Sequence, residues 1–128
     1  MELQQKPKAL TNGLIPPYGG ELKNLIIKDK NLKNDLISKA TYEFECSERN
    51  ACDVELLMVG AFSPLEGFMD QNNYNSVTKN NRDTNGLLFG LPIVFDSNNE
   101  QVKAGETILL TYKKQIIAVL EVSSKWEP

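Results

Sequence analysis

The most constraining feature of this 128-residue chain is a change in the spacing of its hydrophobic residues about half-way along. In the first half these residues recur three or four positions apart, which is the period of an amphipathic helix. In the second half they form nearly continuous runs, which are typical of buried strands. Helices followed by strands predict an α+β domain with short helices and a small mixed or barrel-like sheet.

The helices of the first half are predicted from the residues that cap them. Asp29, Ser47 and Asp70 each precede a stretch with helical spacing, and their side chains can accept hydrogen bonds from the first turn. Gly60 fits the position just after the second of these helices. A short strand is expected at 40–44, between the first helix and the second.

The strands of the second half are predicted from apolar runs and turn residues. The run Leu87–Phe95 predicts a strand buried on both faces, in which Pro92 marks a bulge or an edge position. The stretches 107–112 and 115–122 predict an antiparallel hairpin that turns at Lys113-Lys114.

The length and the charge favour one acidic domain. A chain of this length can bury a core of its own, and its net charge of -3 makes nucleic acid an unfavoured partner. No apolar run approaches the roughly 20 residues that span a bilayer, and no signal peptide is evident at the N-terminus, so a cytoplasmic protein is expected. The two cysteines, Cys46 and Cys52, fit reduced thiols better than a disulfide or a zinc site.

The absence of histidine excludes several kinds of chemistry. The sequence has none among its 128 residues. Catalysis by Ser-His-Asp or Cys-His groups and metal binding through imidazole therefore cannot come from this chain alone.

The first 13 residues predict a flexible tail that ends in a turn at Asn12-Gly13, and residues 14–128 predict the folded domain. Pro16-Pro17-Tyr18-Gly19-Gly20 predicts a shaped loop, since proline fixes φ and glycine frees it. A short extended piece is expected to follow at Leu22–Ile27.

The most distinctive motif lies between the second and third predicted helices. Ser63 and Glu66 fit a capping box with proline at the first helical position, so a single capped helical turn is predicted there. Its apolar residues either pack in the core of this domain or form a face for another domain, and core packing is the favoured alternative. The structural or domain-docking motif consists of Phe62, Ser63, Pro64, Leu65, Gly67, Phe68 and Met69.

Four segments of the chain carry a resemblance to a known family. They are LIPPYGGELKNLI, ERNACDVELLMVGAFSPLEGFMDQNNYNSV, GLLFGLPIVFD and AVLEVSSKWEP, and they extend from Leu14 to Pro128. Together they resemble the N-terminal, PUA-like domain of ATP sulfurylase (sulfate adenylyltransferase) of the bacterial and fungal type. Tyr18 stands where many members of that family have histidine.

The resemblance implies a reaction for the full-length enzyme, in which sulfate attacks the α-phosphorus of ATP with the help of Mg²⁺ to give adenosine 5′-phosphosulfate and pyrophosphate. In that family the chemistry belongs to a following nucleotidyltransferase domain with Q-x-R-N-P-x-H and H-x-x-H segments. This chain contains neither segment, so the resemblance assigns it no catalytic, cofactor-binding or metal-binding residue. It implies a piece of a longer enzyme or a truncated reading frame that is inactive alone.

The expected role is therefore that of a non-catalytic scaffold that docks with the catalytic domain of the same polypeptide, with a homo-oligomer of the full-length enzyme as a further partner. The alternative is a free-standing PUA-like binding module, for which RNA is the ligand that fold analogy suggests. The acidic balance disfavours that alternative. A third alternative, an independent enzyme with a carboxylate site, lacks paired carboxylates at a usable spacing.

Overall fold

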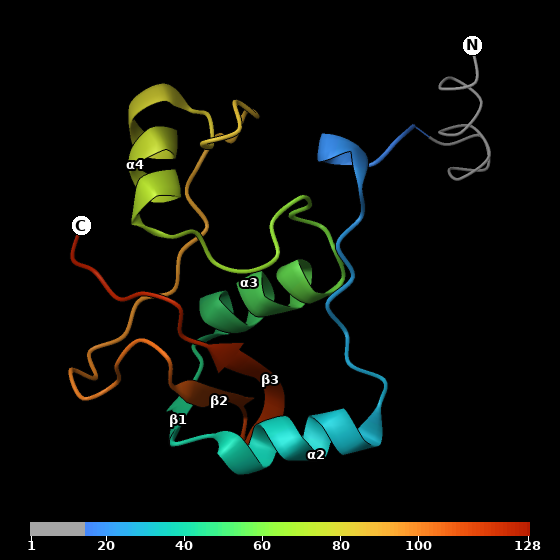
Figure 1. Ribbon diagram of the computed structural model, residues 1–128, viewed down its shortest axis with the longest axis vertical. Coiled ribbons are helices and arrows are strands. Elements are labelled where there is room, and N and C mark those ends of the chain that lie inside the picture. Colours follow the sequence, from blue (N-terminus) through green and yellow to red (C-terminus); the bar gives the residue numbers. More distant parts are fainter. Residues whose placement is uncertain (1–14) are drawn as a thin grey trace.

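The computed structural model describes residues 15–128 (Figure 1). The predicted tail and its turn at Asn12-Gly13 lie outside this range. The elements follow one another as a short 3₁₀ helix and then a series of helices and strands: η1 (Tyr18–Gly20), α2 (Lys30–Lys39), β1 (Tyr42–Glu45), α3 (Glu48–Met58), α4 (Gln71–Asn80), β2 (Thr107–Tyr112) and β3 (Gln115–Glu121).

The sheet has three strands in the order β1-β2-β3, and it is mixed and open rather than closed. β1 pairs with β2 in parallel, whereas β2 and β3 form an antiparallel hairpin. The predicted turn at Lys113-Lys114 is confirmed, and both residues have positive φ, of 49° and 65°. This backbone is that of a type I′ turn, whose twist matches the twist of the paired strands. The α+β prediction is therefore confirmed, with the mixed sheet as the correct alternative.

The three predicted helix caps are confirmed. Asp29 accepts from the first turn of α2, and Asp70 accepts from the backbone N–H of Asn73 in α4. Ser47 caps α3 and forms a reciprocal capping box with Asn50. Gly60 follows the last residues of α3 with a φ of 87°, as expected for the position after a helix.

The prediction of a buried strand at Leu87–Phe95 is wrong. This run forms only an isolated bridge between Arg82 and Leu88, and Leu88 and Leu91 are 58% and 61% exposed. Its backbone pairs with other parts of the chain, since the N–H of Phe89 donates to Asn81 and the N–H of Met69 donates to Ile93. The apolar side chains thus divide between the core and the surface, and hydrophobicity alone does not reveal this division.

The core consists of two clusters of buried side chains. The first lies between α3 and the sheet and contains Cys46, Val54, Val102, Ile108 and Leu110. The second joins the end of α3 to α4 and contains Leu57, Leu65, Met69, Val77 and Ile93. Phe68 packs against both clusters and so connects them.

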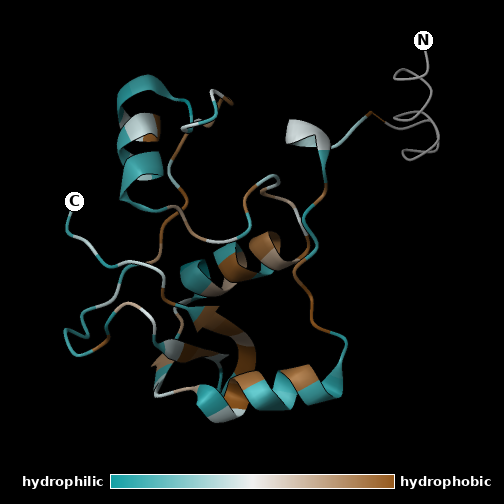
Figure 2. Cartoon of the chain, viewed as in Figure 1, coloured by the Kyte–Doolittle hydropathy of each residue, from teal (hydrophilic) through white to brown (hydrophobic). Residues whose placement is uncertain are grey.

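The predicted extended piece Leu22–Ile27 is extended, but it is not assigned as a strand. Residues 21–29, which we term the arm, lead from η1 past the C-terminal end of α3 to α2 (Figure 1). In Figure 2 the arm alternates between teal and brown stretches, and it passes beside the brown end of α3. No helix within residues 15–128 has both the length and the apolar character needed to cross a bilayer.

Candidate functional site

The candidate site is the motif Phe62–Met69 together with the arm that lies on it. The inner side chains of the motif belong to the core, because Leu65 and Met69 are 9% and 5% exposed and lie in the second cluster. Phe62 is half-buried against the same cluster. Phe68 lies with its ring centroid 5.3 Å from that of Phe95. The motif therefore contributes directly to the packing of this domain.

Ser63 does not cap a helical turn, so that prediction is wrong. Residues 62–65 form a β-turn in which the N–H of Leu65 donates to the carbonyl of Phe62, and the peptide bond before Pro64 is cis. The Ser63 hydroxyl donates to the carbonyl oxygen of Gly60 at 2.6 Å and accepts from the backbone N–H of Lys23 at 2.9 Å. Neither of these partners is the backbone N–H of Glu66, which is the donor that a capping box would require.

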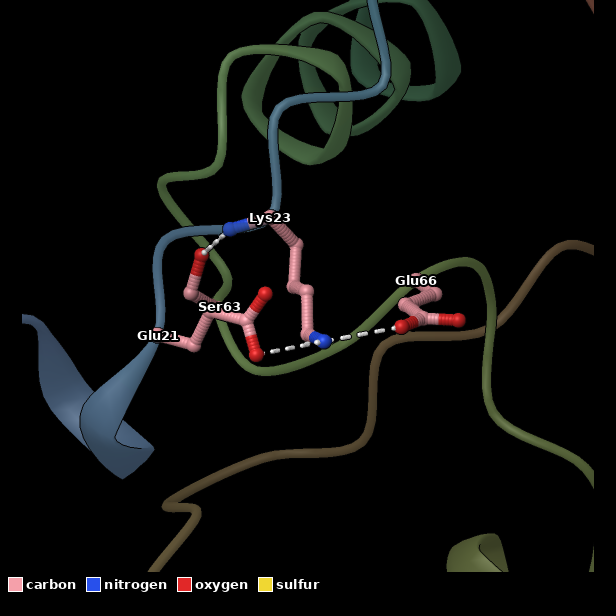
Figure 3. Close-up of polar contacts among 4 residues, drawn as sticks. All are labelled: Glu21, Lys23, Ser63 and Glu66. Carbon is pink, nitrogen blue, oxygen red and sulfur yellow. Dashed lines mark hydrogen bonds and ion pairs between the residues drawn. The ribbon is translucent and has the colours of Figure 1, made fainter.

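Lys23 ties the arm to the motif through its side chain as well as its backbone (Figure 3). Its Nζ lies 3.0 Å from Glu66 Oε1 and 3.2 Å from Glu21 Oε2. Two hydrogen bonds raise the pKa of the Lys23 ammonium, and the bond to Glu66 contributes more than the bond to Glu21. Both carboxylates are well exposed, so the ion pairs orient the arm more than they stabilise the fold.

Pro64 packs against η1, the 3₁₀ helix that immediately precedes the arm in the sequence. A Cβ placed on Gly19 would lie 2.7 Å from Pro64 Cγ, and Gly19 also has a φ of 77°. Only glycine satisfies both conditions without strain. Tyr18 also belongs to η1. Its hydroxyl donates to the carbonyl of Leu88 at 2.7 Å, and the Tyr18 ring packs edge-on against the ring of Phe89.

The end of α3 forms the third contact with the arm. The backbone N–H of Leu25 donates to the carbonyl of Met58 at 2.9 Å. A Cβ on Gly60 would lie 2.8 Å from Leu22 Cδ1, so the absence of a side chain there allows the arm to approach closely. Gly60 therefore ends the helix and also makes room for the arm.

The sequence points to the motif but not to its partner. Lys23 and Glu21 are not predicted as site residues, because nothing in their local pattern indicates a contact with a segment 40 residues away. Tyr18 stands out in the sequence only as a departure from the family pattern. Gly67 has no positive φ, and a Cβ added to it would meet no atom within 4 Å, so the structure does not explain why glycine stands there.

The Mg²⁺ that the resemblance implies for the full-length enzyme calls for oxygen ligands, among which carboxylates are common in proteins. Within this range no three His, Cys, Asp or Glu side chains lie close enough together to hold a metal ion. A hollow of about 400 Å³ lies between α3 and the β2–β3 hairpin, and its lining includes Cys52, Glu48 and Glu55. No step of a reaction is therefore assigned to a metal on this chain.

The comparisons with known proteins agree with the fold. A family model described as a PUA-like domain matches residues 15–128, which is almost the whole chain. The chain belongs to the PUA-like domain family. An open mixed sheet with short helices is the form that this family takes here.

The most informative relatives of this PUA-like domain are sulfate adenylyltransferases. The enzyme of Neurospora crassa is 42% identical over 88% of this chain, and the one of Saccharomyces cerevisiae is 37% identical over 88%. The chain spans only 21% and 24% of these two proteins. The matched part is their N-terminal region, so the predicted resemblance is confirmed.

A solved structure gives a similar result. The hexameric APS kinase from Thiobacillus denitrificans matches 90% of this chain with a TM-score of 0.77 and 31% sequence identity. The match covers 24% of that kinase chain. In each of these proteins the matched region is a minor part of a longer polypeptide.

Proposed function

We propose that this chain is the non-catalytic N-terminal docking domain of a sulfate adenylyltransferase, the enzyme that makes adenosine 5′-phosphosulfate and pyrophosphate from ATP and sulfate. The observation that carries the proposal is the match to the Neurospora crassa enzyme, at 42% identity over 88% of this chain but only 21% of that protein. The larger remainder of that polypeptide is where we place the catalysis.

The chemistry of the side chains supports this division of roles. Phosphoryl transfer depends on positioning and on stabilisation of charge at the transferring group, which arginine, lysine, histidine and Mg²⁺ supply. The motif Phe62–Met69 uses its polar side chains differently, since Ser63 and Glu66 hold the arm. Its best-supported role is therefore to shape the domain and the surface that the arm presents.

The proposal is tested with the isolated chain and with a chimera. In the chimera this chain replaces the matched N-terminal region of the Neurospora crassa sulfate adenylyltransferase. We expect the chimera to catalyse sulfate-dependent exchange of pyrophosphate into ATP, and the isolated chain to give no exchange above the buffer control. Exchange by the isolated chain would contradict the non-catalytic role, and an inactive chimera would contradict the docking role.

A further inference from the structure

Most of the exposed large hydrophobic side chains in the described part of the molecule come from neighbouring segments. Eleven large hydrophobic residues within 15–128 are exposed, and eight of them lie in three neighbouring segments. These segments are η1 with the arm, the C-terminal end of α3, and the loop at 88–91. The eight residues, which we term the arm face, are Tyr18, Leu22, Ile26, Ile27, Leu56, Val59, Leu88 and Leu91.

Direct contacts hold the three segments together. Tyr18 joins η1 to the loop through its hydrogen bond with Leu88. Leu22 joins the arm to α3, since its side chain lies against Gly60. Leu56 lies in the last turn of α3, next to the residues that follow the helix, since its carbonyl accepts from the backbone N–H of Ala61. The three segments that carry the eight exposed residues are therefore in direct contact with one another.

The arm is also fixed in position before anything binds to it. The buried hydroxyl of Ser63 accepts from the backbone of Lys23, and the carbonyl of Met58 accepts from the backbone of Leu25. Lys23 and Leu25 are partly buried against the body of the domain, whereas Leu22, Ile26 and Ile27 are exposed. An apolar surface that is already ordered loses little conformational entropy when a partner covers it.

We infer that the arm face is the surface on which the catalytic part of the same polypeptide docks. This inference rests on the proposed function. The occupant is indicated by the relatives, because more than three quarters of the Neurospora crassa and Eremothecium gossypii sulfate adenylyltransferases lies outside the matched region. A neighbouring domain of that size can bury an apolar surface of this kind, which is otherwise a liability in water.

The test uses two isoleucines of nearly equal exposure. Ile26 lies on the arm face and is 47% exposed, whereas Ile116 lies in β3, outside the arm face, and is 48% exposed. Ile26→Glu and Ile116→Glu are made in the isolated chain and in the chimera with the Neurospora crassa enzyme. In the isolated chain both variants should melt within about 2–4 °C of the parent, as expected for exposed substitutions.

The main measurement is amide hydrogen exchange across residues 21–29. In the parent chimera we expect exchange at least about tenfold slower than in the isolated chain, because docking covers the arm. Ile26→Glu should return exchange in the chimera to the rate of the isolated chain, and Ile116→Glu should leave it slow. Equal exchange in both variants of an active chimera would overturn the arm face as the docking surface and leave the proposed function intact.

Two further outcomes are informative. An inactive parent chimera would overturn the proposed function, and this inference would fall with it. Sedimentation velocity of the isolated chain measures whether it forms a dimer, in which a second copy of the chain would cover the arm face. A dimer that Ile26→Glu dissociates and Ile116→Glu does not would assign the arm face to self-association, which contradicts the inference.

Discussion

The backbone N–H of Lys23 donates a 2.9 Å hydrogen bond to Ser63 Oγ, across 40 residues of sequence. The same hydroxyl donates to the carbonyl of Gly60, so it satisfies one group on the arm and one at the end of α3. Ser63 is 6% exposed, so water cannot readily replace these bonds. This side chain fixes where the arm crosses the motif.

Ser63→Ala should therefore cost about 1–3 kcal/mol of unfolding free energy, since it leaves the Lys23 N–H without its acceptor, while the Gly60 carbonyl keeps the backbone N–H of residue 63 as a donor. Urea denaturation measures this loss. Ser38→Ala is the matched control, because that hydroxyl also donates to a backbone carbonyl, but at an exposed position of α2. Equal losses in the two variants would show that the Ser63 bonds add nothing beyond an ordinary surface hydrogen bond.

The contact between Gly19 and Pro64 gives a second prediction. Gly19→Ala and Gly20→Ala both place a side chain at positive φ, of 77° and 95°, which costs about 1–2 kcal/mol in each case. Only at Gly19 does the new Cβ meet Pro64, and nothing lies within 4 Å of the one at Gly20. We expect hydrogen exchange in residues 21–29 to be faster in Gly19→Ala than in Gly20→Ala.

Indistinguishable exchange in these two variants would mean that the Pro64 contact does not hold η1 and the arm in place. A loss of stability common to both variants is expected from the backbone alone and does not bear on the contact.

The parts of this fold that the sequence predicts are those that local chemistry decides. The caps Asp29, Ser47 and Asp70 act within one turn of their own helices, and the Lys113-Lys114 turn needs only the two strands that it joins. Local patterns are sufficient to locate these elements for that reason.

The parts that could not be predicted depend on distant partners. The role of Ser63 is set by Lys23, and the run Leu87–Phe95 is drawn away from strand pairing by contacts with Asn81 and Met69. The parallel pairing of β1 with β2 likewise joins segments more than 60 residues apart. Periodicity and capping patterns contain no information about such contacts.

The contact between Thr111 and Glu45 gives a prediction about pH. The Thr111 hydroxyl of β2 donates to the Glu45 carboxylate of β1, and this bond lowers the pKa of that carboxyl. A folded-state pKa below the unfolded value adds stability that is present above the unfolded pKa, about 4.3 for glutamate. That stability is lost as the pH falls through the folded pKa.

Thr111→Val removes the donor and keeps the shape of the side chain. We expect the difference in unfolding free energy between the parent and Thr111→Val to be largest near neutral pH and to shrink between about pH 5 and pH 3. Chemical denaturation at a series of pH values measures it. In a Glu45→Gln background the difference should not change over this range, and a parent difference that grows on acidification would contradict the assignment.

Phe68 gives the sharpest prediction about the motif, because its side chain packs against both core clusters. Its ring lies 5.3 Å from that of Phe95, which in turn lies 4.9 Å from that of Phe44 in β1. Phe68→Ala opens a cavity at this junction and should cost roughly 3–5 kcal/mol of unfolding free energy. For one domain this is a large share of the total stability.

Thermal and urea unfolding of the isolated chain decide the matter, with Leu91→Ala as the control. Leu91 is 61% exposed and lies on the arm face, so its truncation should change the unfolding free energy of the isolated chain by less than about 0.5 kcal/mol. If Phe68→Ala were as stable as Leu91→Ala, the ring would not be part of the core, and it would belong with the arm face as a surface for another domain. If only Phe68→Ala loses much unfolding free energy, Phe68 belongs to the core, whereas Leu91 belongs to the surface that lies beside the arm.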